Sequence, residues 1–230
     1  MIEVAIQHNG PFTAVDRNAP SRSFGFHLST TMACPSDEFI IFDTRSLRGG
    51  NKGFIRIIRS VKELILRQKK FKIIFLRGFL GTDLMINKLK EVIAEDKDFK
   101  EHIILIDEII PQKTLIDFYT LSDVFISLLP NDQFGASILD AVFTDCSLII
   151  SDLEVYKHYL GEKGPIYISD QNEDELIKGI EAVMENKNMG KVSEKIRKQL
   201  MNDFNPDKAF QNIYEFCKRV TREHYEASTN

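Results

Sequence analysis

Two aspartates, Asp132 and Asp140, stand on either side of a Phe134-Gly135 pair in the segment NDQFGASILDAVFTDCSLIISD. Gly135 precedes a stretch of helical period that begins at Ala136, so a ligand can approach the backbone there and meet open helix amides. On a helical wheel Asp140 lies above Ala136 at the edge of the apolar side. Both carboxylates are therefore expected at the mouth of one crevice. The alternative is that they only complement the positive end of a helix dipole.

A second group consists of three cations, Arg45, Arg48 and Lys52, which follow an apolar run and precede a helix expected to start near Gly53. Cations are unfavourable at the positive end of a helix, by about 0.3 to 1 kcal/mol each. A bound anion such as a diphosphate would remove this conflict, because it would lie between the amides and the cationic side chains. The alternative is that these are solvated loop charges kept apart by two glycines.

The elements that must position both groups follow a regular pattern. Short apolar runs predict strands at residues 38–43, 72–76, 102–106, 123–128, 147–151 and 165–169, and helical periodicity predicts helices at 52–68, 82–95, 112–121, 136–144, 172–185 and 190–203. Strands that are apolar throughout are typical of parallel sheets covered on both faces. The alternation predicts right-handed βαβ units and an α/β, Rossmann-like, doubly wound parallel sheet, whose ligands bind beyond the carboxyl ends of the strands.

Three segments follow from this pattern. Residues 1–37 contain one plausible strand, EVAIQ, and otherwise have no assigned structure; residues 38–204 form the α/β domain; residues 205–230 form a C-terminal helix and tail. The last segment begins on an Asn-Pro helix-start signal and repeats apolar residues at helical spacing. That helix needs an apolar partner surface, which makes a homo-oligomer one expectation.

Composition excludes several classes of protein. With 230 residues, 43% of them hydrophobic, and a net charge of -4, the chain suits a globular protein and not a nucleic-acid binder. Three widely spaced cysteines fit a reducing cytoplasm, and no apolar run approaches the length of a bilayer crossing. A peripheral contact at the membrane surface stays open. The histidines show no metal-ligand spacing, and no GxGxxG sequence follows the first strand.

Taken in order, the segments EFIIFDTRSLRGGNKGFIRIIRSVKEL, FKIIFLRGF and IDEIIPQKTLIDFYTLSDVFISLLPNDQFGASILDAVFTDCSLIISD resemble the C-terminal, donor-binding half of GT-B retaining glycosyltransferases of family 4 (group 1), over residues 38–220. In that family an Arg and a Lys hold the donor diphosphate, and two acids with seven residues between them enclose a Phe-Gly turn. The resemblance assigns Arg45 and Lys52 to the diphosphate, Asp132 to the transferred sugar and Asp140 to the ribose hydroxyls. It assigns the amides around Gly135 and Ala136 to the diphosphate and Phe134 to the donor site, and it makes Arg45, Lys52 and Asp132 the expected catalytic residues.

This sequence departs from the family at several positions. Both acids are aspartates where the family usually has glutamates, so each carboxylate reaches one methylene less far. Asp107 stands where a glycine usually lies beside the base pocket, and TDCSLIISD replaces the usual small-Gly-Pro turn.

By resemblance, the chain is expected to be a hexosyltransferase of polysaccharide biosynthesis that transfers sugar from a nucleoside-diphosphate sugar to a glycan, lipid-linked or other acceptor. No metal or other cofactor is implied. A complete enzyme of this kind has an N-terminal acceptor domain, for which residues 1–37 are too few, so an absent domain or a partner chain is expected. The competing hypotheses are a non-catalytic nucleotide-sugar-binding or assembly module and an unrelated nucleotide binder.

Overall fold

The structure, a computed structural model, describes residues 21–25, 31–35, 38–48, 52–78, 81–169 and 174–228. The chain divides into two compact units, Met1–Val192 and Ser193–Asn230. The division predicted from sequence, at 37/38 and 204/205, stays a prediction. The predicted strand EVAIQ lies outside the described residues.

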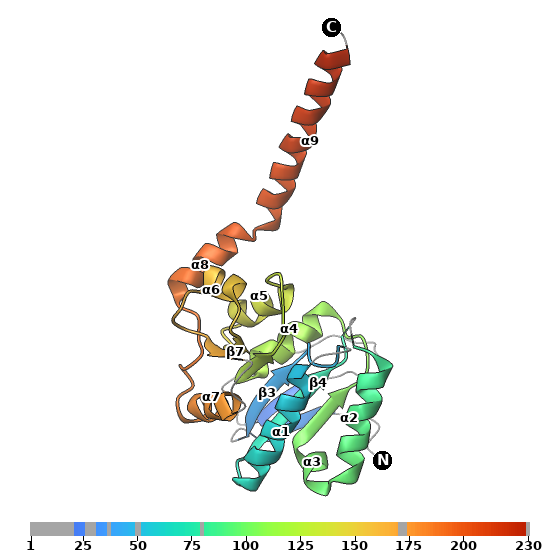
Figure 1. The fold of residues 1–230 in the computed structure, drawn as a ribbon, viewed down its shortest axis with the longest axis vertical. Helices are drawn as coiled ribbons and strands as arrows, with labels where there is room; N and C mark the ends of the chain where they lie inside the picture. Colours follow the sequence, from blue (N-terminus) through green and yellow to red (C-terminus); the bar gives the residue numbers. More distant parts are fainter. Residues whose placement is uncertain are drawn as a thin grey trace. The chain divides into compact units, whose positions relative to one another are not determined.

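Six parallel strands form the central sheet of the first unit, in the order β5-β4-β3-β6-β7-β8. Figure 1 labels β3, β4 and β7 among them. They are β3 (Phe39–Asp43), β4 (Phe71–Leu76), β5 (Ile103–Ile106), β6 (Val124–Ser127), β7 (Ser147–Ser151) and β8 (Ile166–Ile168). The chain builds from β3 to one edge and then from β6 to the other, so the strand order reverses between β3 and β6. The predicted doubly wound parallel sheet is confirmed.

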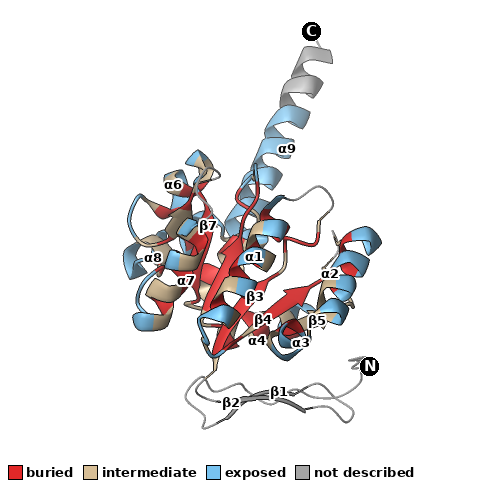
Figure 2. Cartoon of the chain, turned by 60° about the horizontal axis from the view of Figure 1, so that its bottom comes forward, coloured by how far each residue is buried: buried red, intermediate tan, exposed pale blue. Residues whose placement is uncertain are grey.

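Helices cover both faces of this sheet, because alternate side chains of each strand point to opposite sides. The helices of the first unit are α1 (Lys52–Leu66), α2 (Asp83–Glu95), α3 (Lys97–His102), α4 (Gln112–Leu121), α5 (Ala136–Phe143), α6 (Glu154–Leu160) and α7 (Asp174–Glu185). On one face Ile41 joins a core cluster with Phe54 of α1. On the other, the Phe42 ring lies 5.5 Å from Phe118 and 5.0 Å from Tyr119 of α4. Figure 2 shows the strands buried between the helices.

Some elements were missed by the sequence analysis. β1 (Ser21–Gly25) and β2 (Thr31–Pro35) pair as an antiparallel hairpin in a stretch that had no assigned structure. α3 follows α2 after a single residue, Asp96, whose side chain accepts a hydrogen bond from the Asp98 amide and so starts the new helix. The polar sequence around Asp96 resembles a fraying helix end, which is why the second helix was not expected.

The second unit consists of α8 (Glu194–Asp203) and α9 (Pro206–Ser228). The Asn205 side chain accepts hydrogen bonds from the amides of Asp207, at 2.9 Å, and Lys208, at 3.2 Å, as the Asn-Pro signal predicts. Apolar residues of α9 such as Phe210 and Ile213 are exposed. Among the described helices, none combines the length and apolar character that crossing a membrane requires.

Replacing Ile41 by alanine tests the importance of the buried sheet. Ile41 is fully buried on the central strand β3, so Ile41→Ala should lower the free energy of unfolding by about 2 to 5 kcal/mol through lost burial and a residual cavity. The matched control is Ile55→Ala, because Ile55 is exposed on α1 and its loss should cost about 0.5 kcal/mol or less. Urea unfolding followed by circular dichroism measures both, and similar losses would contradict the assigned core.

Candidate active site

The loops after β3 and β6 meet at the point where the strand order reverses, and they meet through an ion pair. Arg45 Nη1 donates to Asp132 Oδ2 and Arg45 Nη2 donates to Asp132 Oδ1, each at 2.7 Å. Two parallel hydrogen bonds of this kind fix the guanidinium and the carboxylate in one plane, which makes the pair strong and directional. The structure therefore joins two of the predicted site residues, although they are 87 positions apart in the chain.

This ion pair is nearly sealed from solvent, since the side chain of Arg45 is 5% exposed and that of Asp132 is 9% exposed. Burial alone would raise the pKa of Asp132, but the hydrogen bonds from Arg45 and Tyr156 lower it to about 2. Asp132 is thus a carboxylate at neutral pH. The carboxylate uses one N–H of each terminal nitrogen, so an anion that is to make the same two parallel hydrogen bonds with the Arg45 guanidinium must displace Asp132.

A second carboxylate, Asp43, holds the turn that carries Arg45. Its Oδ1 accepts hydrogen bonds from the backbone amides of Arg45 and Ser46, both at 2.8 Å. An aspartate that bonds the backbone two and three residues ahead fixes a tight turn without a glycine. Asp43 is buried at the end of β3, and burial raises its pKa to about 6.

The loop that carries Asp132 contains one residue in an uncommon backbone conformation, Phe134, and aromatic packing holds that residue in place. Phe134 has a φ of 59°, an uncommon conformation for a bulky residue that is often found at functional sites. Its ring is buried and stacks on Tyr159 with 4.4 Å between centroids. Phe134 is therefore placed beside the predicted site as a packing residue, and its ring faces protein on at least one side.

Gly135 and Ala136 lie at the start of α5, and the two differ in what their positions allow. A Cβ at Gly135 would lie 3.2 Å from Arg45 Nη1 and 3.3 Å from Nη2, so a larger residue there would require the guanidinium to shift by a few tenths of an ångström within its ion pair. The Gly135 amide donates to Asp132 Oδ2 at 3.3 Å. The Gly135 amide is therefore hydrogen-bonded in this state, although the sequence analysis expected the first helix amides to be open to a ligand. No side chain caps the helix that begins at Ala136.

Asp140 lies half-buried on α5, and its surroundings differ from those of Asp132. Burial raises its pKa, and a hydrogen bond with the Gln112 side chain at the start of α4 opposes that effect. No contact between Asp140 and Asp132 is seen in the described part of the chain. The two predicted acids thus occupy separate environments, one neutralised by an arginine and one beside an amide.

The other two predicted cations differ in exposure. Lys52 is the first residue of α1 and is exposed, with no described contact to Arg45 or Asp132. Arg48 is half-buried, and both burial and the charge of Arg45 lower its pKa. A positive charge at Arg48 is therefore unfavourable in this state, and a nearby anion would stabilise it.

Tyr156 of α6 was missed by the sequence analysis. Its hydroxyl donates to Asp132 Oδ2 at 2.7 Å, so a third element contributes to the ion pair. The sequence analysis predicted no helix at 154–160, and only the fold brings this tyrosine to the loop after β6. Asp152 closes an apolar run, so its sequence context predicts a helix N-cap. That prediction is wrong: Leu153 precedes α6 as its cap, and Asp152 pairs with Lys157 at 2.6 Å.

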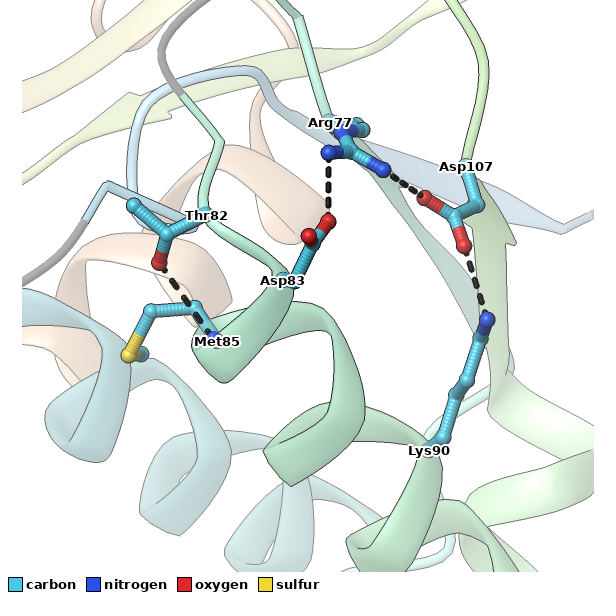
Figure 3. A network of polar contacts seen from close by, with 6 residues as sticks. All are labelled: Arg77, Thr82, Asp83, Met85, Lys90 and Asp107. Atoms are coloured by element: carbon cyan, nitrogen blue, oxygen red, sulfur yellow. Dashed lines mark hydrogen bonds and ion pairs between the residues drawn. The ribbon is translucent and has the colours of Figure 1, made fainter.

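A separate network of charges occupies the carboxyl ends of β4 and β5 (Figure 3). Arg77 contacts Asp83 at 2.6 Å and Asp107 at 3.1 Å, and Lys90 contacts Asp107 at 2.7 Å. Asp107 is the residue that stands in place of the family's glycine, and here two cations neutralise it. The network joins two neighbouring loops, so it fixes their spacing at this end of the sheet.

No group of three or more histidine, cysteine, aspartate or glutamate side chains within the described ranges is arranged to hold a metal ion. The expectation that the site works without a metal stays a prediction.

Neutralising Asp132 should destabilise the fold. Asp132→Asn leaves the buried Arg45 without its carboxylate, so we expect the free energy of unfolding to fall by about 3 to 5 kcal/mol. Asp83→Asn is the control, because the Asp83 side chain is 80% exposed in its pair with Arg77 and such pairs contribute about 1 kcal/mol or less. Urea unfolding at pH 7 compares the two, and equal effects would mean that the Arg45–Asp132 pair is not buried.

Asp43 should make stability depend on pH. Its pKa of about 6 in the folded protein lies above the unfolded value, so its contribution is fully present below about pH 4 and is lost as the pH rises through 6. Between pH 4 and pH 7 the wild-type protein should lose about 2 kcal/mol relative to Asp43→Asn, which keeps an oxygen for both amides. Urea unfolding across this range is the measurement, and parallel pH profiles would refute the assignment.

Comparison with known proteins agrees with the fold and with the sequence pattern. The family described as Glycosyl transferases group 1 matches residues 35–202. Among curated protein sequences, none matches this chain significantly.

Three solved structures illustrate the similarity. Sucrose-phosphate synthase of Thermosynechococcus elongatus has a TM-score of 0.66 at 13% identity and covers 83% of this chain and 47% of its own. An Anabaena protein solved with UDP and glucose has a TM-score of 0.61 at 14% identity and covers 80% of this chain and 49% of its own. The C-terminal domain of a group 1 protein of Francisella tularensis has a TM-score of 0.58 at 14% identity, with 72% of this chain and 86% of its own covered.

This chain therefore spans about half the length of the first two structures, and nearly all of an isolated C-terminal domain. At these identities the likeness concerns the fold alone. The family match covers well over half of the sequence, so the chain belongs to the group 1 glycosyl transferases and has the fold of their C-terminal, GT-B domain.

Proposed function

We propose that this chain is the donor-binding half of a retaining glycosyltransferase and that it binds a nucleoside-diphosphate sugar where the loops after β3 and β6 meet. One observation carries the proposal: two arginines, Arg45 and Arg48, are partly or fully desolvated at the switch point of a parallel sheet, beside the uncapped start of α5. Ligands of such sheets bind at the switch point, and anions bind at helix N-termini. Family membership and the Anabaena structure with UDP and glucose support the choice of ligand.

The donor would bind by exchange of partners at Arg45. A diphosphate carries more negative charge than a carboxylate and can also accept two parallel hydrogen bonds, so it can take the place of Asp132 on the guanidinium. Arg48 would gain a counter-ion that relieves its repulsion from Arg45. Lys52, exposed at the start of α1, and the Ala136 amide would complete the diphosphate site.

The two acids would then have different roles. Asp132, released from Arg45, would accept hydrogen bonds from the transferred sugar, while Gly135 allows the donor to approach the backbone. Asp140 would accept hydrogen bonds from the ribose hydroxyls, and the energetic cost of its burial would be offset by those donors.

Catalysis would be electrostatic. As the bond between sugar and phosphate breaks, negative charge develops on the diphosphate, and fixed cations and helix amides stabilise it most in the transition state. The acceptor would attack on the face from which the diphosphate leaves, and the diphosphate would take its proton, so this half of the enzyme would supply neither a base nor a metal. The acceptor site, for a glycan or lipid-linked acceptor of polysaccharide biosynthesis in the cytoplasm or at the membrane surface, would come from an N-terminal domain or a partner chain.

The second candidate is a non-catalytic module that binds nucleotide sugars or serves assembly. Two observations favour it. Asp132 is bonded to Arg45 in a pair that is almost sealed from solvent, and the shorter aspartate stands at both positions where the family usually has a glutamate. A site that cannot open would bind donors weakly or not at all.

Isothermal titration with UDP, GDP and ADP, with and without magnesium, tests the proposal. We expect metal-independent binding of one nucleoside diphosphate. Asp140→Ala should weaken it by about 1 to 3 kcal/mol, because the ribose loses a buried acceptor. Arg45→Ala should weaken binding of the nucleoside diphosphate far more than binding of the free nucleoside. The ratio of these two losses does not change if the variant is partly unfolded, because unfolding lowers both affinities equally.

The matched controls are Asp98→Ala and Arg67→Ala, which remove an exposed acid and an exposed base at the opposite ends of the strands. Neither should change the affinity. Absence of binding by the wild-type chain to all three nucleotides would contradict the proposal. Equal losses of nucleoside and nucleoside diphosphate in Arg45→Ala would exclude the phosphate role of Arg45.

A further inference from the structure

Tyr156 is a fully buried residue whose hydroxyl reaches the candidate site. It lies on α6, and its ring meets Phe134 edge to face at 6.4 Å between centroids. Phe134 is also stacked on Tyr159 of the same helix. The loop that carries Asp132 is thus held against α6 by aromatic packing on two sides, so the position of the Tyr156 hydroxyl relative to this loop is fixed.

Both partners of the Tyr156–Asp132 hydrogen bond keep one protonation state near neutral pH. Burial and the adjacent Asp132 charge raise the pKa of Tyr156, and the pKa of Asp132 is lowered. The phenol therefore donates and the carboxylate accepts throughout the working range. Tyr156 lowers the pKa of Asp132 as Arg45 does, so its hydrogen bond favours the carboxylate form when Arg45 turns away.

The two oxygens of Asp132 are not equivalent. Oδ2 accepts hydrogen bonds from Arg45 Nη1, the Tyr156 hydroxyl and the Gly135 amide. Oδ1 accepts only from Arg45 Nη2 among the described residues. If Arg45 turns to another anion, Oδ2 keeps two donors and Oδ1 keeps none.

We propose that Tyr156 is a positioning residue for the donor sugar: it anchors Oδ2 of Asp132 so that Oδ1 is presented to a sugar hydroxyl once the diphosphate has taken Arg45. The inference rests on the proposed function. It gives α6 a direct part in the site, and it explains how an aspartate can serve in a place where the family usually has a longer glutamate. A carboxylate with one methylene less has a shorter reach, but one oxygen tied to a buried hydroxyl gives it a fixed direction.

Tyr156→Phe tests this inference, because it removes one oxygen and keeps the packing against Phe134. Tyr167→Phe is the matched control, since the partly buried Tyr167 hydroxyl donates to the Gly161 carbonyl at 2.5 Å and does not reach Asp132. For both variants, titration calorimetry compares the nucleoside diphosphate that the wild-type protein binds with its glucose and N-acetylglucosamine conjugates. Urea unfolding of both variants shows whether the loss of either hydroxyl lowers the free energy of unfolding by the same amount.

We expect Tyr156→Phe to bind the nucleoside diphosphate within about twofold of wild type and the preferred sugar conjugate about tenfold more weakly, as for the loss of one hydrogen bond to a charged group. Tyr167→Phe should change neither affinity. Equal weakening of both ligands in Tyr156→Phe would show a merely structural role and overturn the inference, as would unchanged affinities. Those two results leave the proposed function intact, whereas a wild-type protein that binds no nucleoside diphosphate refutes the proposed function itself and the inference with it.

Discussion

The ion pair between Arg45 and Asp132 is the interaction on which the arrangement of the site depends. It joins the loops after β3 and β6, the two strands between which the sheet changes direction. Because the pair is nearly sealed, each partner requires the other to offset the cost of its own burial. Asp43 holds the turn that carries Arg45, and Tyr156 donates to Asp132, so both restrict the pair further. The carboxyl edge of the central strands is therefore organised around one arginine.

The sequence was sufficient to predict the fold, because a parallel sheet buried on both faces leaves a local trace. Each strand reads as a short apolar run, and helices such as α1 keep their apolar residues on one side. Turn-forming residues around Gly135 likewise predicted the loop after β6 from local sequence. Elements without such a trace were missed: α3 is six residues long and mostly charged, and the hairpin of β1 and β2 lies in a polar stretch.

The site could be predicted only as a set of residues near one edge of the sheet. Arg45 and Asp132 were both identified, but as ligands of an absent molecule and not as partners of each other. Which of two groups 87 positions apart bonds the other depends on strand order and loop geometry, and neither is written in local sequence. Tyr156 was missed for a similar reason: the helix that carries it, α6, was not predicted, and the role of its hydroxyl is decided by where the loop after β6 comes to lie.

The close approach of Arg45 to Gly135 also bears on how relatives of this chain can vary. A methyl group at position 135 would crowd both terminal nitrogens of the guanidinium, so a change at one position disturbs the geometry at the other. A lineage that acquires alanine at position 135 must either shift the arginine within its pair with the acid or carry a shorter side chain at position 45, in which case the loop after β6 needs another partner for the acid. Paired substitution at these two positions would therefore record, in sequence alone, which members of the family close their site in this way.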